Sequence, residues 1–491
     1  MQVRLVLYVL GNLLVVLGAA MVLPLAVALA AADSQLPLER YEVLGFLAAI
    51  SASMIGGLGL RSGFEERSLT QLGNREGCAI VTFTWLLFSL IGCLPMVITG
   101  TASFTDAYFE TMSGFTTTGA SVLSQMEVLP HGLGLWRCQT QWMGGMGIVV
   151  LSVAILPFLG MGGYRMFKAE VPGGSTFERN APRIKDIAKV LWITYLAMTI
   201  LEIVLLLAGN MTVYDAVCHT FTTMSTGGFS TRTASVAYWP SPWIQWVIIL
   251  FMFLAGANFS IYHQLVAGPR RQALDNPEFK LYLLLNLVLV AIFAGVLQQA
   301  GAVNGHGEPV VRAAAFQVLS IGTTTGFATE DFELWPDLLR LLLLLLMFLG
   351  GCTGSTGGGM KVARVMIAFK SVVTELRRSI NPRAVLVVRV GDRTIDRETA
   401  ANTMSFFAMY VGLFTVGTLA LAFLGLDLTT ASSALAANLG NIGPGLGSVG
   451  PTANFAHVPM LGKWILVLAM LLGRLELYSV MVLLLPRTWV R

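Results

Sequence analysis

Long apolar runs alternate with short polar segments along the whole of this 491-residue chain. A run of about 17–25 apolar residues is long enough to cross a bilayer as a helix. Ten runs meet this criterion, and a glycine-rich stretch interrupts the eighth. They are residues 5–30, 41–60, 78–99, 135–159, 187–208, 243–266, 280–300, 338–371, 399–425 and 463–485. The pattern predicts an all-α polytopic membrane protein with ten transmembrane helices.

Four shorter segments of apolar or small residues lie between the later runs, and each is too short to span a bilayer. They are residues 106–115, 214–224, 311–322 and 430–440. We expect each to dip into the membrane as a re-entrant helix. Asp106 and Asp215, near the start of the first two, are expected to cap those helices.

A similar polar phrase follows each short segment. The four copies are Thr-Thr-Thr-Gly-Ala-Ser at 116–121, Ser-Thr-Gly-Gly-Phe-Ser at 225–230, Thr-Thr-Thr-Gly-Phe-Ala at 323–328 and Asn-Ile-Gly-Pro-Gly-Leu at 441–446. The fourth copy is degenerate, with one extra residue before the glycine that we align with the others. A single copy would be interpreted as a turn, but four copies at equivalent places predict one structure built from all of them.

This spacing predicts four pseudo-symmetric helix–pore loop–helix repeats around one pore. The two runs that precede them predict an accessory hairpin beside the pore. The expected divisions are the N-terminal two-helix hairpin at 1–76, repeat 1 at 77–163, repeat 2 at 164–270, repeat 3 with its broken second helix at 271–380, and repeat 4 at 381–491.

Composition agrees with a membrane protein, and charge orients it. Hydrophobic residues make up 55% of the chain and charged residues 12%, against about 25% charged residues in soluble domains. Most of the 31 lysines and arginines fall near the termini and in alternate loops, at 61–75, 165–189, 270–280 and 361–397. The positive-inside rule makes these loops and both termini cytoplasmic, so the four phrases face outside.

The end of the first run, Ala-Leu-Ala-Ala-Ala-Asp at 28–33, resembles a signal-peptidase site. The apolar run before it is longer than the 7–15 residues of a signal h-region. We therefore expect the first span to be retained.

The four phrases are rich in glycine, threonine and serine and carry no ionised side chain. Backbone carbonyls that point into a pore can replace the water around a potassium ion, and glycine tolerates the backbone conformations that this requires. The phrases therefore predict a potassium-binding filter, with the matching glycines at Gly119, Gly228, Gly326 and Gly445. The candidate filter residues are Thr116, Thr117, Thr118, Gly119, Ser225, Thr226, Gly227, Gly228, Thr323, Thr324, Thr325, Gly326, Asn441, Ile442, Gly443, Pro444 and Gly445.

Two features below the phrases predict a gate. A broken helix at membrane depth must line a cavity or lie buried in protein, although close packing through small residues is a compatible alternative. Arg474, inside the tenth run, is costly in a membrane; we expect it to line the pore, the alternative being a salt bridge with Glu476, Glu202 or Glu110. The candidate gate residues are Gly350, Gly351, Cys352, Thr353, Gly354, Ser355, Thr356, Gly357, Gly358, Gly359, Lys361 and Arg474.

The four phrases, together with Gly-Gly-Cys-Thr-Gly-Ser-Thr-Gly-Gly-Gly-Met-Lys-Val-Ala-Arg at 350–364, resemble the Trk/Ktr/HKT superfamily of potassium-translocating subunits. The two N-terminal runs resemble the TrkH type. The resemblance implies a multi-pass protein of the bacterial inner (plasma) membrane that transports potassium and is gated by the glycine-rich loop. Some plant relatives have serine at the first filter glycine and pass sodium, so glycine at 119 favours potassium.

The resemblance also implies partners: a homodimer with a pore in each protomer, and a cytoplasmic nucleotide-binding regulatory subunit of TrkA type. The basic loop after the eighth run could bind that subunit or anionic membrane lipid. We expect no nucleic-acid partner and no cofactor, with potassium as the substrate. No constellation of residues in the sequence favours an enzyme; the alternative is a proton- or sodium-coupled potassium symporter with alternating access.

Overall fold

The chain is mostly helical in the computed structural model, which describes residues 1–31, 37–64, 73–159, 184–268, 274–303, 307–384, 386–391 and 393–489. The α-helices are α1 (Val3–Ala20), α2 (Val22–Ala31), α3 (Pro37–Gly63), α4 (Asn74–Gly92), α5 (Leu94–Ile98), α6 (Phe104–Phe115), α7 (His131–Leu159), α9 (Ile184–Ala208), α10 (Val213–Met224), α11 (Pro242–Gly256), α12 (Phe259–Ala267), α14 (Pro277–Ala300), α15 (Glu308–Gly322), α16 (Asp337–Leu349), α17 (Val362–Ile380), α18 (Arg397–Phe423), α19 (Leu428–Leu439), α20 (Met460–Arg474) and α21 (Tyr478–Met481). Short 3₁₀ turns are η4 (Ser235–Tyr238), η5 (Phe332–Leu334), η6 (Gly447–Val449), η7 (Val482–Leu484) and η8 (Pro486–Thr488).

One small sheet departs from the all-α expectation. Strands β1 (Val388–Val390) and β2 (Arg393–Ile395) pair antiparallel, with Val390 opposite Arg393. This hairpin lies between α17 and α18, in the basic segment that follows the glycine-rich loop.

Six helical stretches in the described ranges are long and apolar enough to cross a membrane. They are Val3–Ala31, Tyr41–Gly63, Arg75–Ile98, Lys189–Ala208, Pro277–Ala300 and Arg397–Phe423. Met460–Arg474 and Tyr478–Leu484 together make a seventh candidate that bends by 110°. A helical polytopic membrane architecture is therefore confirmed, and the other predicted runs consist of shorter or interrupted helices.

Breaks occur in more helices than the sequence predicted. The expected break at 350–359 separates α16 from α17, but α11 and α12 are also separated near Ala257, and Gly147 (φ 7°, ψ −101°) interrupts α7. Between α20 and α21, Glu476 and Leu477 both adopt left-handed φ near 57° and 56°. The break in α7 lies among glycines and the break near Ala257 is flanked by Gly256 and the N-cap Asn258, whereas Glu476 and Leu477 carry no glycine or proline signal.

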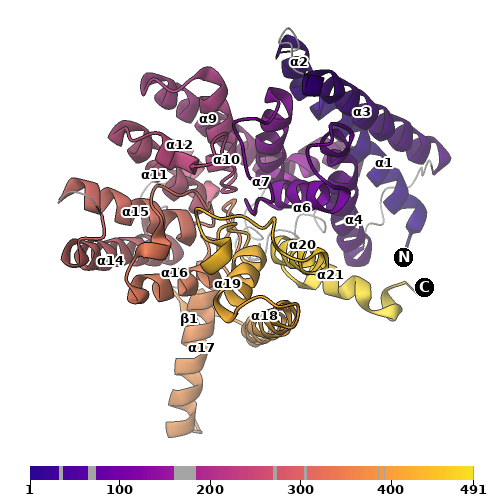
Figure 1. Cartoon of the computed structure of the whole chain (residues 1–491). Coiled ribbons are helices and arrows are strands. Elements are labelled where there is room, and N and C mark those ends of the chain that lie inside the picture. The colour runs from indigo at the N-terminus through magenta and orange to yellow at the C-terminus, as the bar shows by residue number, and fades with distance from the viewer. Residues whose placement is uncertain are drawn as a thin grey trace.

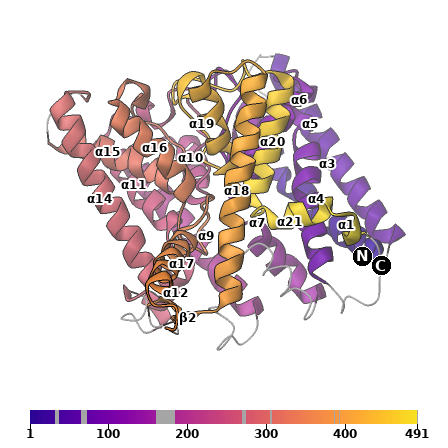
Figure 2. The same cartoon turned by 90° about the horizontal axis from the view of Figure 1, so that it is seen from below.

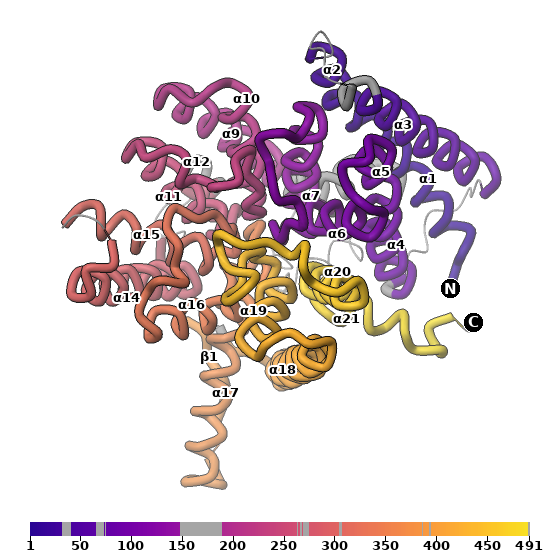
Figure 3. The backbone as a smooth tube through the Cα atoms, in the orientation of Figure 1, coloured from indigo at the N-terminus to yellow at the C-terminus, as the bar shows by residue number. Residues whose placement is uncertain are grey.

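The helices from α4 onward follow one another around a common centre, and α1–α3 lie outside the first of them (Figures 1 and 3). In Figure 1, α17 projects from the lower edge of the molecule; in the view from below, α6 and α19 lie in the upper part of the picture (Figure 2). The two termini lie close together in both orientations. The predicted domain boundaries at 163/164 and 270/271 fall outside the residues that the structure describes.

The N-terminal hairpin packs through glycines. A Cβ atom on Gly11 of α1 would lie 2.7 Å from the carbonyl oxygen of Gly57 in α3, and one on Gly57 would lie 2.8 Å from that of Gly11. Nearby, Ser53 Oγ donates to the carbonyl oxygen of Leu14 at 2.6 Å. Such close backbone approach favours helix association in a membrane, where apolar burial alone does not.

Four short helices of 12–15 residues (α6, α10, α15 and α19) occupy the predicted dipping segments. The prediction that Asp106 and Asp215 cap the first two is wrong by one turn. Ser103 and Thr212 are the N-caps, and their hydroxyls accept from the amides of Asp106 (3.3 Å) and Asp215 (3.1 Å). The aspartates lie in the first turn, where a negative charge still favours the helix dipole.

Candidate functional site

One backbone conformation recurs after the four short helices, in segments that we call the first to fourth Gly segments (116–119, 225–228, 323–326 and 440–443). The second residue of each has a left-handed φ: Thr117 (53°), Thr226 (53°), Thr324 (65°) and Asn441 (56°). The fourth residue is a glycine with a left-handed φ: Gly119 (81°), Gly228 (75°), Gly326 (83°) and Gly443 (98°). Only glycine adopts this region at little steric cost.

Hydrogen bonding gives the same register. The amide of the third residue in each Gly segment donates at 2.8 Å to a carbonyl oxygen in the preceding helix. These bonds are Thr118 to Ser113, Gly227 to Thr222, Thr325 to Ser320 and Ile442 to Ala437. The four segments are therefore structurally equivalent, residue by residue.

The register corrects one prediction. Gly443, not Gly445, is equivalent to the other three glycines, and the fourth copy has no extra residue before it. Gly445 lies two residues later, where its amide donates to the carbonyl oxygen of Val449 at 2.8 Å. The sequence misled because Gly440-Asn441-Ile442 shares no residue type with Thr-Thr-Thr, so the alignment rested on the glycines alone.

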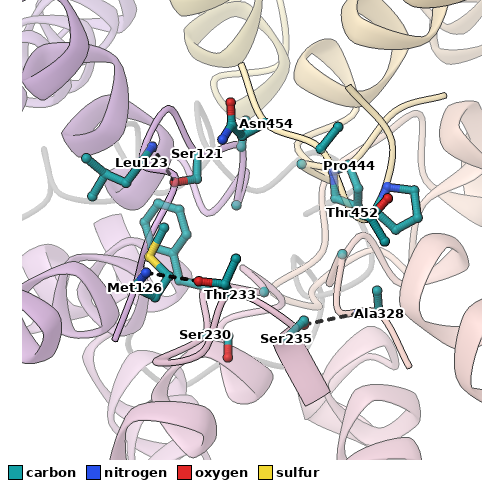
Figure 4. A pocket seen from close by; sticks show the side chains of 18 of the residues that line it. Ser121, Leu123, Met126, Ser230, Thr233, Ser235, Ala328, Pro444, Thr452 and Asn454 are labelled. Carbon is teal, nitrogen blue, oxygen red and sulfur yellow. Dashed lines mark hydrogen bonds between the residues drawn. The ribbon is translucent and has the colours of Figure 1, made fainter. Parts of the chain in front are cut away.

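The four Gly segments contact one another in a closed cycle. A Cβ atom on each left-handed glycine would overlap the carbonyl oxygen just before the glycine of a neighbouring segment. The pairs are Gly119 with Gly227, Gly228 with Thr325, Gly326 with Ile442, and Gly443 with Thr118. All four of these glycines line one pocket at an end of the cycle. Figure 4 shows other residues of its lining. The segments therefore surround one axis that opens to this pocket.

Side chains brace the cycle from behind. In the first and third segments, the hydroxyls of Thr116 and Thr118, and of Thr323 and Thr325, lie 2.8 Å apart. Asn441 Nδ2 donates to Thr118 Oγ1 at 3.0 Å and so joins the fourth segment to the first. These bonds hold the backbone in a conformation that unsupported residues adopt only at a cost.

Gln141 of α7 braces the second segment. Its Nε2 donates to the carbonyl oxygen of Gly227 at 2.7 Å, and its Oε1 accepts from the amide of Phe229 at 3.1 Å. A carbonyl oxygen has two lone pairs, so Gly227 keeps one for another ligand. Sequence analysis missed Gln141, although a polar residue inside an apolar run is itself a signal.

The 350–359 loop lies directly against the Gly segments. The amide of Gly358 donates to Thr324 Oγ1 at 2.7 Å, and Thr356 Oγ1 lies 3.4 Å from Thr226 Oγ1. A Cβ atom on Gly357 would lie 2.8 Å from the carbonyl oxygen of Thr323, and one on Gly358 would overlap that of Gly440. The loop therefore contacts the second, third and fourth segments, and glycine is required for this approach.

The same loop satisfies the broken end of α11. The amide of Cys352 donates to the carbonyl oxygen of Gly256 at 2.8 Å, and Thr356 Oγ1 donates to that of Ala255 at 3.3 Å. Carbonyls at a helix end inside a membrane need such partners. The two breaks, at 257–258 and at 350–359, therefore form one structure.

Arg474, at the end of α20, also bonds to the 350–359 loop. Its guanidinium donates to the carbonyl oxygens of Thr356 at 2.8 Å and of Gly144, in α7, at 2.6 Å. Of the carboxylates proposed as alternative partners, Glu476 pairs with Arg364 and Glu110 with Arg137. Arg474 therefore ties the 350–359 loop to α7 through backbone oxygens.

Lys361 and the pair formed by Arg364 and Glu476 lie just inside the loop. Lys361 Nζ donates to the carbonyl oxygen of Gly357, and its own φ is left-handed at 64°. The guanidinium of Arg364 also stacks over the ring of Phe406, 4.1 Å from its centroid. The candidate gate residues thus lie together, on the segment between α16 and α17 and at the end of α20, and most of them are buried.

Comparison with known proteins is consistent with this geometry. The profile of the TrkH family, described as "Cation transport protein", matches residues 45–488. The chain belongs to the TrkH family. It is 37% identical to the Trk system potassium uptake protein TrkH of Salmonella typhimurium over the full length of both chains, and 35% identical to TrkG of Escherichia coli over 85% of this chain and 86% of that one.

A solved structure matches this TrkH-family fold across its whole length. The crystal structure of the potassium transporter TrkH from Vibrio parahaemolyticus superposes with a TM-score of 0.87, at 35% identity and full coverage of both chains. The homologues are transporters, and this chain is accordingly not an enzyme.

At the mouth of the pocket, loops that follow the Gly segments of the TrkH-family chain are bonded to one another. The amide of Met126 donates to Thr233 Oγ1 at 3.1 Å, and the amide of Ala328 donates to Ser235 Oγ at 3.2 Å (Figure 4). Glu127 accepts from Thr233 Oγ1 at 2.6 Å. Partial burial raises the pKa of Glu127, but the bonds from Thr233 outweigh it and lower the pKa below its ordinary value.

Proposed function

We propose that this protein is the membrane subunit of a Trk-type potassium uptake system and conducts potassium through the axis of the four Gly segments. The closed cycle of those segments is the observation that carries the proposal, because four equivalent backbones around one axis can present rings of carbonyl oxygens to a dehydrated cation. The names of the relatives, which are potassium uptake proteins, support the choice of ion.

The short helices favour a cation at the inner end of this filter. Each of α6, α10, α15 and α19 ends at its Gly segment, so its C-terminal carbonyls lie near the axis. A helix C-terminus carries roughly half a negative charge. Four such ends stabilise an ion that has lost part of its water without placing a carboxylate in its path.

The gate in this proposal is the 350–359 loop together with Lys361 and Arg474. The loop lies across the inner side of the filter, and the bonds of Arg474 to Thr356 and Gly144 hold it there. Release of those bonds would free the loop to move aside. Two cationic side chains beside the path also oppose ion entry by repulsion while the loop is in place.

The wider arrangement is proposed as follows. Ten spans and four repeats, divided as the sequence predicts, cross the bacterial inner membrane with both termini and the α17–β-hairpin region on the cytoplasmic side. The protein is a homodimer and binds a nucleotide-binding regulatory subunit of TrkA type through that basic region. The exposed Arg377 and the half-buried Arg378, both in the last turn of α17, support this assignment.

A glycine substitution in the filter tests the function. Gly326→Ser would force a Cβ atom into the space of the Ile442 carbonyl oxygen. We expect the purified variant in liposomes to take up rubidium with reduced preference over sodium. Undiminished discrimination in a folded variant would overturn the carbonyl filter, and no rubidium uptake by the unaltered protein, opened by its regulatory subunit, would overturn the proposed transport itself.

A further inference from the structure

A polar side chain recurs at one position of the short helices, six residues before the Gly segment begins. The residues are Glu110 in α6, His219 in α10 and Gln317 in α15, whereas α19 has Ala434. All three polar residues are fully buried. Their shared place behind the Gly segments indicates a shared task.

Each of these side chains forms a hydrogen bond with a residue that follows its own Gly segment by two or three positions. Glu110 Oε1 accepts from Ser121 Oγ at 2.9 Å, and His219 Nε2 lies 3.0 Å from Ser230 Oγ. In α15, Gln317 Nε2 donates to Thr329 Oγ1 at 3.4 Å. The outer end of each segment is therefore tied back to the helix that precedes it.

The fourth repeat makes this connection from the neighbouring position. Ser433 Oγ accepts from the amide of Leu446 at 2.8 Å and lies 3.0 Å from the carbonyl oxygen of the same residue. Within the described chain, Glu110 differs from the other three braces because it is an acid paired with a base.

That base is Arg137 of α7, which is only 3% exposed. Its Nη2 and Nε donate to Glu110 Oε1 at 2.6 and 2.8 Å. Separating a buried ion pair leaves an unpaired charge in the protein interior, which strongly destabilises the fold. The two side chains are therefore held together. Guanidinium geometry adds directional constraint to the contact.

The pair spans two Gly segments. On one side, Glu110 Oε2 accepts from the amide of Val122, which follows the first segment, at 2.9 Å. On the other side, Arg137 lies over the ring of Phe229, 4.1 Å from its centroid, and its Nη1 donates to the carbonyl oxygen of Ser230 at 3.4 Å. Phe229 and Ser230 directly follow Gly228. Figure 4 shows Ser121 and Ser230 on the two loops that this pair connects.

Resting on the proposed potassium pathway, we propose that Glu110 and Arg137 are positioning residues that clamp the outer ends of the first and second Gly segments and thereby set the discrimination between potassium and sodium. They act by fixing the spacing of carbonyl oxygens, the quantity on which discrimination by a carbonyl cage depends.

The test compares rubidium and sodium uptake by purified, full-length protein in liposomes, with thermal stability measured in parallel. Glu110→Gln preserves shape but removes the charge and leaves Arg137 unpaired. We expect the rubidium-to-sodium ratio to fall about tenfold, the size expected from one charge-assisted hydrogen bond. Ser121→Ala keeps the ion pair and removes one bond, so its ratio should fall less, by about threefold.

The control is Lys463→Gln, which breaks an ion pair between α20 and Asp106 at the other end of α6 (2.6 Å). Its ratio should equal that of the unaltered protein. A lower melting temperature with an unchanged ratio in both Glu110→Gln and Ser121→Ala would overturn the clamp and leave the transport function standing. If Glu110→Gln does not fold, an unchanged ratio in Ser121→Ala alone has the same meaning.

Discussion

At the scale of single residues, the Gly segments depend on left-handed backbone at two of every four positions. Glycine fills one of them in all four segments, while threonine or asparagine fills the other with a left-handed φ of 53–65°. A non-glycine residue in this conformation is disfavoured. The conformation persists at the second residue of each Gly segment because hydrogen bonds to helix carbonyls and hydroxyls, and contacts with neighbouring segments, fix the peptide groups on both sides of that residue.

Gly443 and Gly445 give a direct test of the register. Gly443→Ala would place a methyl group near the carbonyl oxygen of Thr118 at φ 98°, and we expect rubidium-over-sodium selectivity in liposomes to fall at least about tenfold. Gly445→Ala is the comparison: its φ is not left-handed, and its Cβ atom would lie 2.9 Å from Val449 Cγ2 and 3.0 Å from Ser433 Oγ rather than against a carbonyl oxygen of another Gly segment, so its selectivity should fall less. Equal loss of selectivity in both variants would contradict the assignment of Gly443.

At the scale of elements, the broken helices act together rather than singly. The 350–359 loop donates to the open carbonyl oxygens at the end of α11, and Arg474 at the end of α20 donates to the carbonyl oxygen of Thr356 in the loop. Inside a membrane, such groups have no water to bind. A change in one break is therefore transmitted to the next.

Removal of the Arg474 guanidinium tests that coupling. Arg474→Ala deletes the bonds to Thr356 and Gly144, and we expect basal rubidium flux without a regulatory subunit to rise several-fold as the loop is released. Arg474→Lys keeps the charge and should give an intermediate flux. Unchanged flux in Arg474→Ala at equal protein content would exclude the gating role.

The N-cap of α19 gives a prediction about stability. Bonds from Thr430 lower the pKa of Asp427, so its ionised form stabilises the folded state. This contribution is complete above the unfolded pKa of about 3.9 and is lost as the pH falls through the lower folded value. Asp427→Ala should lower the free energy of unfolding by about 0.5–2 kcal/mol at neutral pH.

Thermal melts in detergent would measure the effect of this cap. Asp427→Asn is the control, since asparagine also caps helices well. It should match the unaltered protein at neutral pH and lack this acid-dependent loss of stability. A melting temperature of Asp427→Ala equal to that of Asp427→Asn would contradict the capping assignment.

At the scale of the whole molecule, four equivalent Gly segments of unlike sequence contact one another in a closed cycle. In the proposed arrangement, the 350–359 loop and Arg474 each occur once on the inner side of this nearly symmetric cycle. The proposed static filter with a movable inner loop predicts conduction, whereas a symporter with alternating access must close on both sides of its site.

Flux measurements distinguish these mechanisms. We expect rubidium uptake into liposomes to follow the rubidium gradient alone and to continue when proton and sodium gradients are collapsed. The Arg474→Ala variant provides a constitutively active form for this assay. Uptake against a rubidium gradient, driven by an imposed proton or sodium gradient, would instead establish the coupled mechanism.

Local sequence determined the helical polytopic membrane class, six long apolar spans, where the short helices lie, and three of the four equivalent glycines. Apolar length and the places of the glycines are each encoded within a few residues. Only the tertiary structure decided the register of Gly443, the additional helix breaks, and the partners of Glu110, Arg137, Gln141 and Arg474. Those features depend on hydrogen bonds and contacts between residues that are far apart in the sequence. Local sequence patterns do not indicate which distant groups will come within hydrogen-bonding distance, about 3 Å.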